Sequence, residues 1–144
     1  AGVTFAAAIT VVTGEKSPDK EFAIAAAAEH SLPHHIVHVT SADLIDTYLP
    51  SCVRILHTFD GMTLRNSLVV AAAMRKTAEL GFFQAVVGDG ADELFGGYSF
   101  MWGSGDDTDE WKRKRDKLCS EWTFATSALA ASYGLTSHSP YTEQ

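Results

Sequence analysis

Positive charge is scarce in this sequence. Its 144 residues include 11 Lys and Arg against 18 Asp and Glu, a formal net charge of −7. Binding nucleic acid through its phosphates needs the opposite balance, so the composition argues against a nucleic-acid partner. Long apolar runs are also missing: none reaches the roughly 20 residues that span a bilayer, so we predict no membrane segment. The apolar stretch 2–12 has no basic residues before it and no clear cleavage site, and we interpret it as a strand rather than a signal peptide.

Cysteine is nearly as scarce. Cys52 and Cys119 are the only two, and neither belongs to a C-x-x-C or zinc-binding spacing. We therefore predict reduced thiols in a cytoplasmic protein. The rest of the composition, 46% hydrophobic and 20% charged, is that of a globular chain long enough for one compact domain. Because the chain begins at Ala1 without an initiator methionine, we expect it to be processed, trimmed or incomplete.

Apolar runs alternate with helical patterns along the chain. The predicted strands cover residues 3–12, 34–39 and 82–87, the last of them buried. The predicted helices cover residues 18–30, 42–49, 50–57 and 64–80. Ser17 and Thr63 are suited to cap the first and the last of these helices, Gly81 can end the last, and Phe22 belongs to the apolar face of the first. This order predicts an α/β fold with a parallel sheet and right-handed crossovers.

An acidic, glycine-rich stretch follows the third predicted strand. Gly88 and Gly90 permit positive φ angles and a close approach of a ligand to the backbone. Asp89, Asp92 and Glu93 place three mutually repelling carboxylates within one turn, which suggests a cation such as Mg²⁺ between protein and phosphate. Since ligands of parallel α/β sheets bind beyond the carboxyl ends of strands, the pattern indicates nucleotide or phosphate chemistry. A solvated acidic loop stays open as the alternative, whereas a calcium loop fits worse because the D-x-[DN]-x-[DN]-G spacing is absent.

Two other polar clusters have simpler interpretations. His35 and His38 would point to opposite faces of the second predicted strand, which argues against a shared metal ion. The five basic residues between 112 and 117 are interpreted as the solvated face of a helix rather than as an anion-binding patch. The stretch 103–110 before them is predicted to be a flexible acidic linker.

The stretch 88–98, GDGADELFGGY, resembles the G-[DE]-G-x-D-E-[LV]-F-G-G-Y signature of the asparagine synthetase C-terminal domain. That family belongs to the ATP pyrophosphatases, or adenine nucleotide alpha-hydrolase-like proteins. Residues 11–19 are similar to the family's adenine-binding strand and loop, and residues 58–67 to its segment beside the substrate pocket. The resemblance implies a three-layer α/β/α fold with a parallel sheet, followed by C-terminal helices. It divides the chain into a nucleotide-binding core, 1–102, and an acidic linker with the start of the helical part, 103–144.

The resemblance also implies a reaction. MgATP would adenylate the side-chain carboxylate of aspartate, and ammonia would then displace AMP to give asparagine, so ATP and Mg²⁺ are the expected cofactors. The implied site residues are Val12, Gly88 and Gly90 for the nucleotide, Asp89 and Arg65 for catalysis, and Asp92 and Glu93 for the metal. Three alternatives stay open: Val12 as an ordinary core residue, Arg65 as a surface residue and Glu93 as a brace of the loop.

Three departures from the family pattern limit this interpretation. The S-G-G-x-D-S pyrophosphate loop and its central strand are missing, which predicts a sheet incomplete at its N-terminal strand and a poorly stable core unless another segment fills the gap. The tail 133–143 resembles G-[LV]-E-x-R-x-P-F-L-D, but Thr136 and His138 replace the acid and the arginine. No glutaminase domain is present, so ammonia would come free or from a glutaminase domain or subunit, and a homo-oligomer stays open. The rival functions are another amide- or lactam-forming ligase and a non-catalytic nucleotide-binding relative or fragment.

Overall fold

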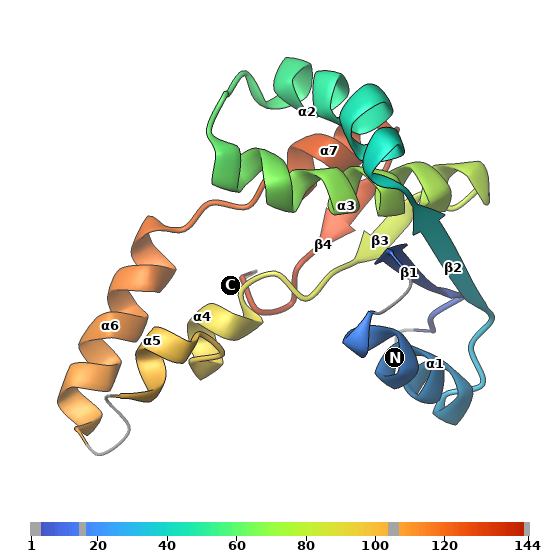
Figure 1. The fold of residues 1–144 in the computed structure, drawn as a ribbon. Helices are drawn as coiled ribbons and strands as arrows, with labels where there is room; N and C mark the ends of the chain where they lie inside the picture. The colour runs from blue at the N-terminus through green and yellow to red at the C-terminus, as the bar shows by residue number, and fades with distance from the viewer. Residues whose placement is uncertain (1–3, 15–16, 104–106, 143–144) are drawn as a thin grey trace.

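The computed structural model describes residues 4–14, 17–103 and 107–142 of a mixed α/β chain with parallel strands (Figure 1). The start of the predicted first strand at residue 3 and the middle of the predicted linker, 104–106, lie outside the described residues. In chain order the elements are β1 (Ala8–Thr13), α1 (Pro18–Glu29), β2 (His34–Val39), a π-helix (Asp43–Tyr48), α2 (Leu49–Leu56), α3 (Gly61–Glu79), β3 (Gln84–Val86), α4 (Ala91–Phe95), α5 (Ser99–Trp102), α6 (Thr108–Glu121), α7 (Thr126–Ser132) and β4 (Thr136–His138).

The first unit of the fold is the pair β1 and β2, connected through α1. The two strands run parallel, with Ala8 beside His34 and Thr13 beside Val39. The predicted second strand and crossover helix are confirmed, whereas the first strand begins at Ala8 rather than at residue 3, and Val12 is its one buried residue. The predicted apolar face of α1 is wrong for Phe22, whose side chain is 77% exposed, because α1 packs on β1 and buries only Ala27 among its described side chains.

The long helix α3 is the centre of the core. Its buried Leu64, Ala71 and Ala72 pack in one cluster with residues of β2, α2 and α7. The helix begins at Gly61, three residues earlier than predicted, because Asp60 rather than Thr63 caps it: Asp60 Oδ1 accepts a hydrogen bond from the Thr63 amide at 2.7 Å. This hydrogen bond holds the pKa of Asp60 below its ordinary value. The start of α3 is therefore fixed by a polar contact at its first turn.

The segment between β2 and α2 forms a π-helix over Asp43–Tyr48, where an α-helix was predicted for residues 42–49. It continues directly into α2, and it buries Tyr48 against the same core cluster.

The second unit is the pair β3 and β4, which also run parallel, with Gln84 beside Thr136. β4 was not predicted. The third predicted strand exists, but its predicted burial is wrong: Phe83 is 77% and Val86 47% exposed. The reason is that β3 pairs only with β4 among the described residues, so that the four strands form two separate pairs rather than one sheet.

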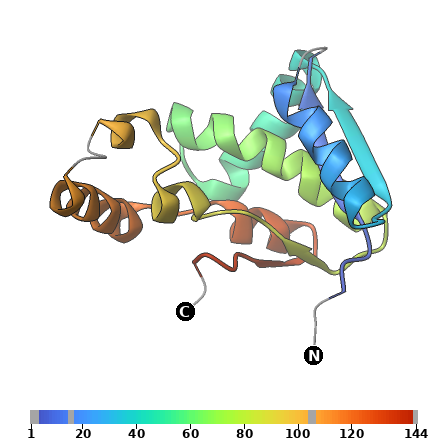
Figure 2. The ribbon, with the colours of Figure 1, turned by 90° about the horizontal axis from the view of Figure 1, so that it is seen from below.

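The two strand pairs lie at different places along α3, as the view from below shows (Figure 2). The open edges of β1 and β3 line one cavity of about 660 Å³, with Met74 and Thr77 of α3 also in its wall.

The chain beyond residue 102 both leaves and rejoins the core. α6 packs on α4, and Figure 1 shows α4, α5 and α6 at the opposite side of the molecule from α1. α7 then packs on α2 and α3, and β4 on β3. The division of the chain at residue 102 stays a prediction, and part of the second segment completes the core of the first.

No helix within the described ranges combines the length and the apolar character that crossing a bilayer requires.

Candidate functional site

The acidic stretch lies where β3 ends and α4 begins. Gly90 has φ +91°, and a Cβ atom at this position would clash with Thr142 and press against Tyr141. Glycine is therefore required here both by the backbone conformation and by the tail that passes beside it. At Gly88 a Cβ atom would meet nothing within 4 Å, so the backbone there is open.

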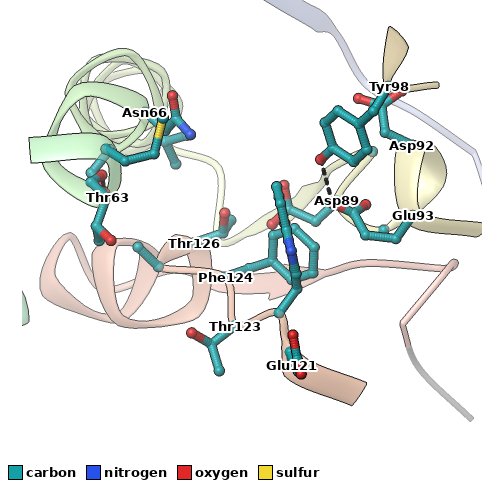
Figure 3. Close-up of a pocket in the computed structure, with 17 residues that line it drawn as sticks. Thr63, Asn66, Asp89, Asp92, Glu93, Tyr98, Glu121, Thr123, Phe124 and Thr126 are labelled. Atoms are coloured by element: carbon teal, nitrogen blue, oxygen red, sulfur yellow. Dashed lines mark hydrogen bonds between the residues drawn. The ribbon is translucent and has the colours of Figure 1, made fainter. Parts of the chain in front are cut away.

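A cavity of about 440 Å³ opens beside this stretch, with walls from three parts of the chain (Figure 3). Thr63 and Asn66 come from the first turns of α3, Asp89 and Asp92 from the acidic stretch, and Thr123 from the segment between α6 and α7. We call the space the acidic cavity, because its described lining includes four carboxylates and no Lys, Arg or His side chain. The four are Asp89, Asp92, Glu93 and Glu121. An anionic ligand can enter such a cavity only together with a cation.

Asp89 places a buried carboxylate oxygen in the wall of the acidic cavity. Its Oδ2 atom is buried and receives no hydrogen bond from any described residue. A buried carboxylate oxygen without a partner is destabilising, so this atom is placed for a cation or a hydrogen-bond donor that comes from outside the described chain.

Asp92 lies on the solvent-exposed side of α4, with its carboxylate against the Cα atom of Gly97. A Cβ atom on Gly97 would overlap Oδ1 of Asp92. The amides of Gly96 and Gly97 both donate to the Asp92 carbonyl, at 2.9 and 3.0 Å, so the helix ends immediately beside this carboxylate. The second glycine of the pair thus provides the space that the Asp92 side chain occupies.

Glu93 behaves differently from its neighbour. It is 3% exposed, and Tyr98 Oη donates a hydrogen bond to its Oε1 at 2.5 Å, drawn as a dashed line in Figure 3. Burial and the negative charge of Glu93 raise the pKa of Tyr98, so the phenol stays protonated and keeps donating. No three His, Cys, Asp or Glu side chains of the described residues are placed to share one metal ion. The Tyr98 hydrogen bond occupies one oxygen of Glu93, which supports the interpretation of this residue as a brace of the loop.

Val12 and Arg65, the remaining predicted site residues, lie outside the acidic cavity. Val12 is 1% exposed at the end of β1 and lines another cavity, of about 790 Å³, together with residues 13–14 and 38–41. Burial and cavity contact coexist there, so both interpretations of Val12 stay open. Arg65 is exposed, and the face of α3 that lines the acidic cavity carries Thr63, Asn66 and Ser67 instead. Helical spacing turns Arg65 away from that face, which does not support a substrate contact.

Several lining residues gave no signal in the sequence. Trp122, Thr123 and Phe124 form one wall of the acidic cavity, although more than 20 residues separate them from the acidic stretch. Among the aromatic contacts of the described residues, only the contact of the Tyr98 ring with the Trp122 ring, at a centroid distance of 5.1 Å, connects the two walls. No local pattern encodes such a contact.

The chain matches the asparagine synthase family over residues 3–139, nearly its whole length. It belongs to that family. Three similar curated proteins are the glutamine-hydrolysing asparagine synthetase of Asparagus officinalis, 34% identical over 87 residues, that of Zea mays, 36% over 85, and the probable one of Dictyostelium discoideum, 37% over 68. These alignments cover 60%, 59% and 47% of this chain but only 15%, 14% and 12% of the relatives. This asparagine synthase family member therefore aligns with a small part of each relative, and the GDGADELFGGY stretch lies within the matched family region.

Proposed function

We propose that this chain forms part of an ATP-dependent ligase that makes asparagine. The side-chain carboxylate of aspartate attacks the α-phosphorus of ATP and displaces pyrophosphate, and ammonia then attacks the acyl carbon and releases AMP. The observation that carries the proposal is the acidic cavity beyond β3, where Asp89 has a buried oxygen without a partner and Asp92 stands beside it in the sequence motif of the family. Such a site acts by positioning the reactants and by electrostatic stabilisation.

Asp89 and Asp92 fit a divalent cation in this proposal. Both are carboxylates on the wall of one cavity that has no basic described side chain, and oxygen ligands suit Mg²⁺. When bound, Mg²⁺ neutralises the charge of the leaving pyrophosphate. Asp92 holds the ion, and Asp89 faces the reacting centre. The backbone at Gly88, open on its Cα side, and at Gly90 lets the nucleotide approach.

The cavity beside Val12 is the proposed place of the adenine ring. Its described lining, from Val12 and Gly14 to residues 38–41 and Leu44, contains no carboxylate. A neutral aromatic base suits this surface better than the acidic cavity. Val12 lies in the last residues of β1 and Gly88 follows the end of β3, so we propose that one nucleotide reaches both places across the carboxyl ends of the strands.

A fifth strand between β1 and β3 would complete the proposed three-layer fold. Both strands present an unpaired edge among the described residues, and both edges line the same 660 Å³ cavity. A parallel strand inserted there would join the two pairs into one sheet covered by α3. The loop at its carboxyl end would emerge between the two proposed ligand sites, where it can supply the phosphate-binding amides that the acidic cavity needs. A further segment of the polypeptide or a partner chain is the source of this strand.

Ammonia is proposed to come from a glutaminase domain or subunit, because the relatives are named as glutamine-hydrolysing enzymes. A homo-oligomer remains a proposal without structural support, and the cytoplasmic location rests only on the two free thiols, Cys52 and Cys119.

A second candidate is a ligase of the same family that activates a different carboxylic acid. Thr136 and His138, which replace the acid and the arginine of the family tail, both lie in β4, and the Val87 amide donates to the His138 carbonyl at 2.9 Å. The changed positions are thus fixed directly beside the start of the acidic stretch.

The test is exchange of labelled pyrophosphate into ATP with Mg²⁺, measured with aspartate and with a panel of other carboxylic acids. Exchange that requires aspartate is the expected result. Exchange with another acid alone would assign the second candidate. A lack of exchange with every acid, in the full polypeptide and with its partner chain present, would overturn both.

A further inference from the structure

We propose that Tyr98 is a positioning residue that joins two walls of the acidic cavity: its hydroxyl group holds Glu93, and its ring contacts Trp122. The inference rests on the proposed function in one respect, because the carboxylate that Tyr98 positions is the proposed metal ligand Asp92. Neither Tyr98 nor Trp122 contacts a reacting atom in this assignment.

The hydroxyl contact closes a short loop around Asp92. Glu93 follows Asp92 in α4, and the chain reverses at Gly96, which has φ +72°, so that Tyr98 returns to the Glu93 carboxylate. The closed segment 93–98 keeps Gly97 against the Asp92 carboxylate. Loss of the Tyr98 hydroxyl would open this loop and release the Asp92 side chain from its place.

The ring of Tyr98 also contacts the opposite wall of the acidic cavity. The Tyr98 ring stacks on Phe100 with a centroid distance of 5.3 Å and an interplanar angle of 6°. It also contacts Trp122 at 5.1 Å and 43°, and Trp122 in turn contacts Phe124 at 6.3 Å. Trp122 and Phe124 belong to the segment between α6 and α7 that lines the cavity. The Tyr98 side chain therefore contacts both the acidic stretch and that segment.

This assignment competes with a direct metal contact of Glu93. A Glu93 carboxylate that bound the ion would need an orientation toward it, whereas the buried carboxylate here accepts the Tyr98 hydrogen bond. The two roles respond oppositely to substitution. A ligand depends on the negative charge of residue 93, whereas a brace depends on the hydrogen bond between residues 93 and 98.

The experiment compares Tyr98→Phe with Glu93→Gln, using Mn²⁺ as the probe and electron paramagnetic resonance to count the free ion. Tyr98→Phe leaves the buried Glu93 without its donor, and we expect at least about tenfold weaker Mn²⁺ binding. Glu93→Gln keeps an acceptor for the phenol, and we expect a change below about threefold. Tyr141→Phe is the matched control, because it removes an exposed hydroxyl from a ring that contacts Phe95 rather than Glu93, and it should bind as the wild type does. A large loss for Glu93→Gln with little change for Tyr98→Phe would overturn the proposal.

Amide hydrogen exchange tests the same assignment without a metal. In Tyr98→Phe the amides of Gly96 and Gly97 should exchange at least about tenfold faster, while the amides of α3 keep their wild-type rates. Unchanged exchange at both glycines would overturn the positioning role, and acceleration throughout α3 would show a merely structural one. If the wild type binds no Mn²⁺, the proposed metal site fails, and the exchange rates alone decide the role of Tyr98.

Discussion

The two cavities beyond the ends of β1 and β3 occupy equivalent places in the fold and have opposite chemistry. The cavity beside Val12 has hydroxyl, histidine and aliphatic groups in its described lining, and the acidic cavity has four carboxylates without a basic side chain. Each cavity lies beside the carboxyl end of a strand that belongs to a parallel pair. The contrast fits the nucleotide of the proposed function, with its neutral base beside β1 and its phosphates, which arrive with a cation, beside β3.

The two cavities also differ in how their key side chains are held. Val12 is fixed by burial in a strand that pairs with β2. Asp92 is exposed, and it is fixed by the turn that follows α4, through Gly97 and the contact between Glu93 and Tyr98. Substitutions beside β1 should therefore affect stability and nucleotide affinity together, whereas substitutions beside β3 should affect the chemistry with little effect on stability.

Asp92→Asn should have the largest effect and tests the difference between the two cavities most directly. The change removes a charge but keeps the shape of an exposed side chain, so we expect pyrophosphate exchange to fall by at least about a hundredfold, with an unchanged unfolding midpoint. Urea unfolding and the exchange assay measure the two effects. Asp46→Asn, at an exposed carboxylate of the π-helix that lines neither cavity, is the matched control and should be active. Full exchange activity in Asp92→Asn would remove the metal assignment.

Gly97→Ala should have the next largest effect. The new methyl group would overlap the Asp92 carboxylate and force it to another position, so we expect roughly tenfold lower exchange and a higher Mg²⁺ requirement. Gly103→Ala is the control, because a Cβ atom at Gly103 meets nothing within 4 Å. Equal activity of the two alanine variants would show that the position of Asp92 is unimportant.

Val12→Ala tests the other cavity. Removing two methyl groups from a side chain that is 1% exposed should lower the free energy of unfolding by about 2 kcal/mol. If Val12 contacts adenine, KM for ATP should also rise, by about threefold or more, while the Mg²⁺ requirement stays as it was. Cys52→Ala, at a fully buried site outside both cavities, is the control for stability alone. An unchanged KM in Val12→Ala would assign this residue to the core only.

The local part of the acidic site was predictable from the sequence, because neighbouring residues form it. Gly90 has a positive φ angle, which the sequence permits at both Gly88 and Gly90, and Asp89 and Asp92 line one cavity. The three carboxylates nevertheless proved unequal. Successive residues of a helix point about 100° apart, so α4 exposes Asp92 and buries Glu93, and a spacing in sequence does not reveal which side is covered.

The distant part of the fold and of the site was not predictable. β4 has the residues Thr-Ser-His, which carry no strand signal, and it forms because the edge of β3 offers hydrogen-bond partners. Trp122 reaches Tyr98 only after α6 has reversed the chain. The prediction for Arg65 failed to find support because the face of a helix depends on its packing. Here the packing buries Leu64, and Met62, Thr63 and Asn66 rather than Arg65 face the cavity.

The smallest expected effect is the contribution of Asp60 to the pH dependence of stability. Asp60 caps a helix, in contrast to the carboxylates of the acidic cavity, which are proposed to act on the ligand. Its pKa lies below the ordinary value of 3.8, first because the Thr63 amide donates to it and then through the other hydrogen bonds at the cap. The folded protein therefore binds the proton more weakly than the unfolded chain. The stabilisation of α3 by this cap is complete above the unfolded pKa and is lost as the pH falls through the lower folded pKa.

Urea unfolding across this acidic range, with Asp60→Asn as comparison, measures the effect. Asparagine also caps helices but does not titrate, so the variant should lack this part of the acid-induced loss of stability. The first turns of α3 also form one wall of the acidic cavity. Fraying of this cap should therefore lower the exchange of pyrophosphate into ATP only at low pH. A pH dependence of unfolding that is identical in the two proteins would show that protonation of Asp60 does not change the stability of the folded protein.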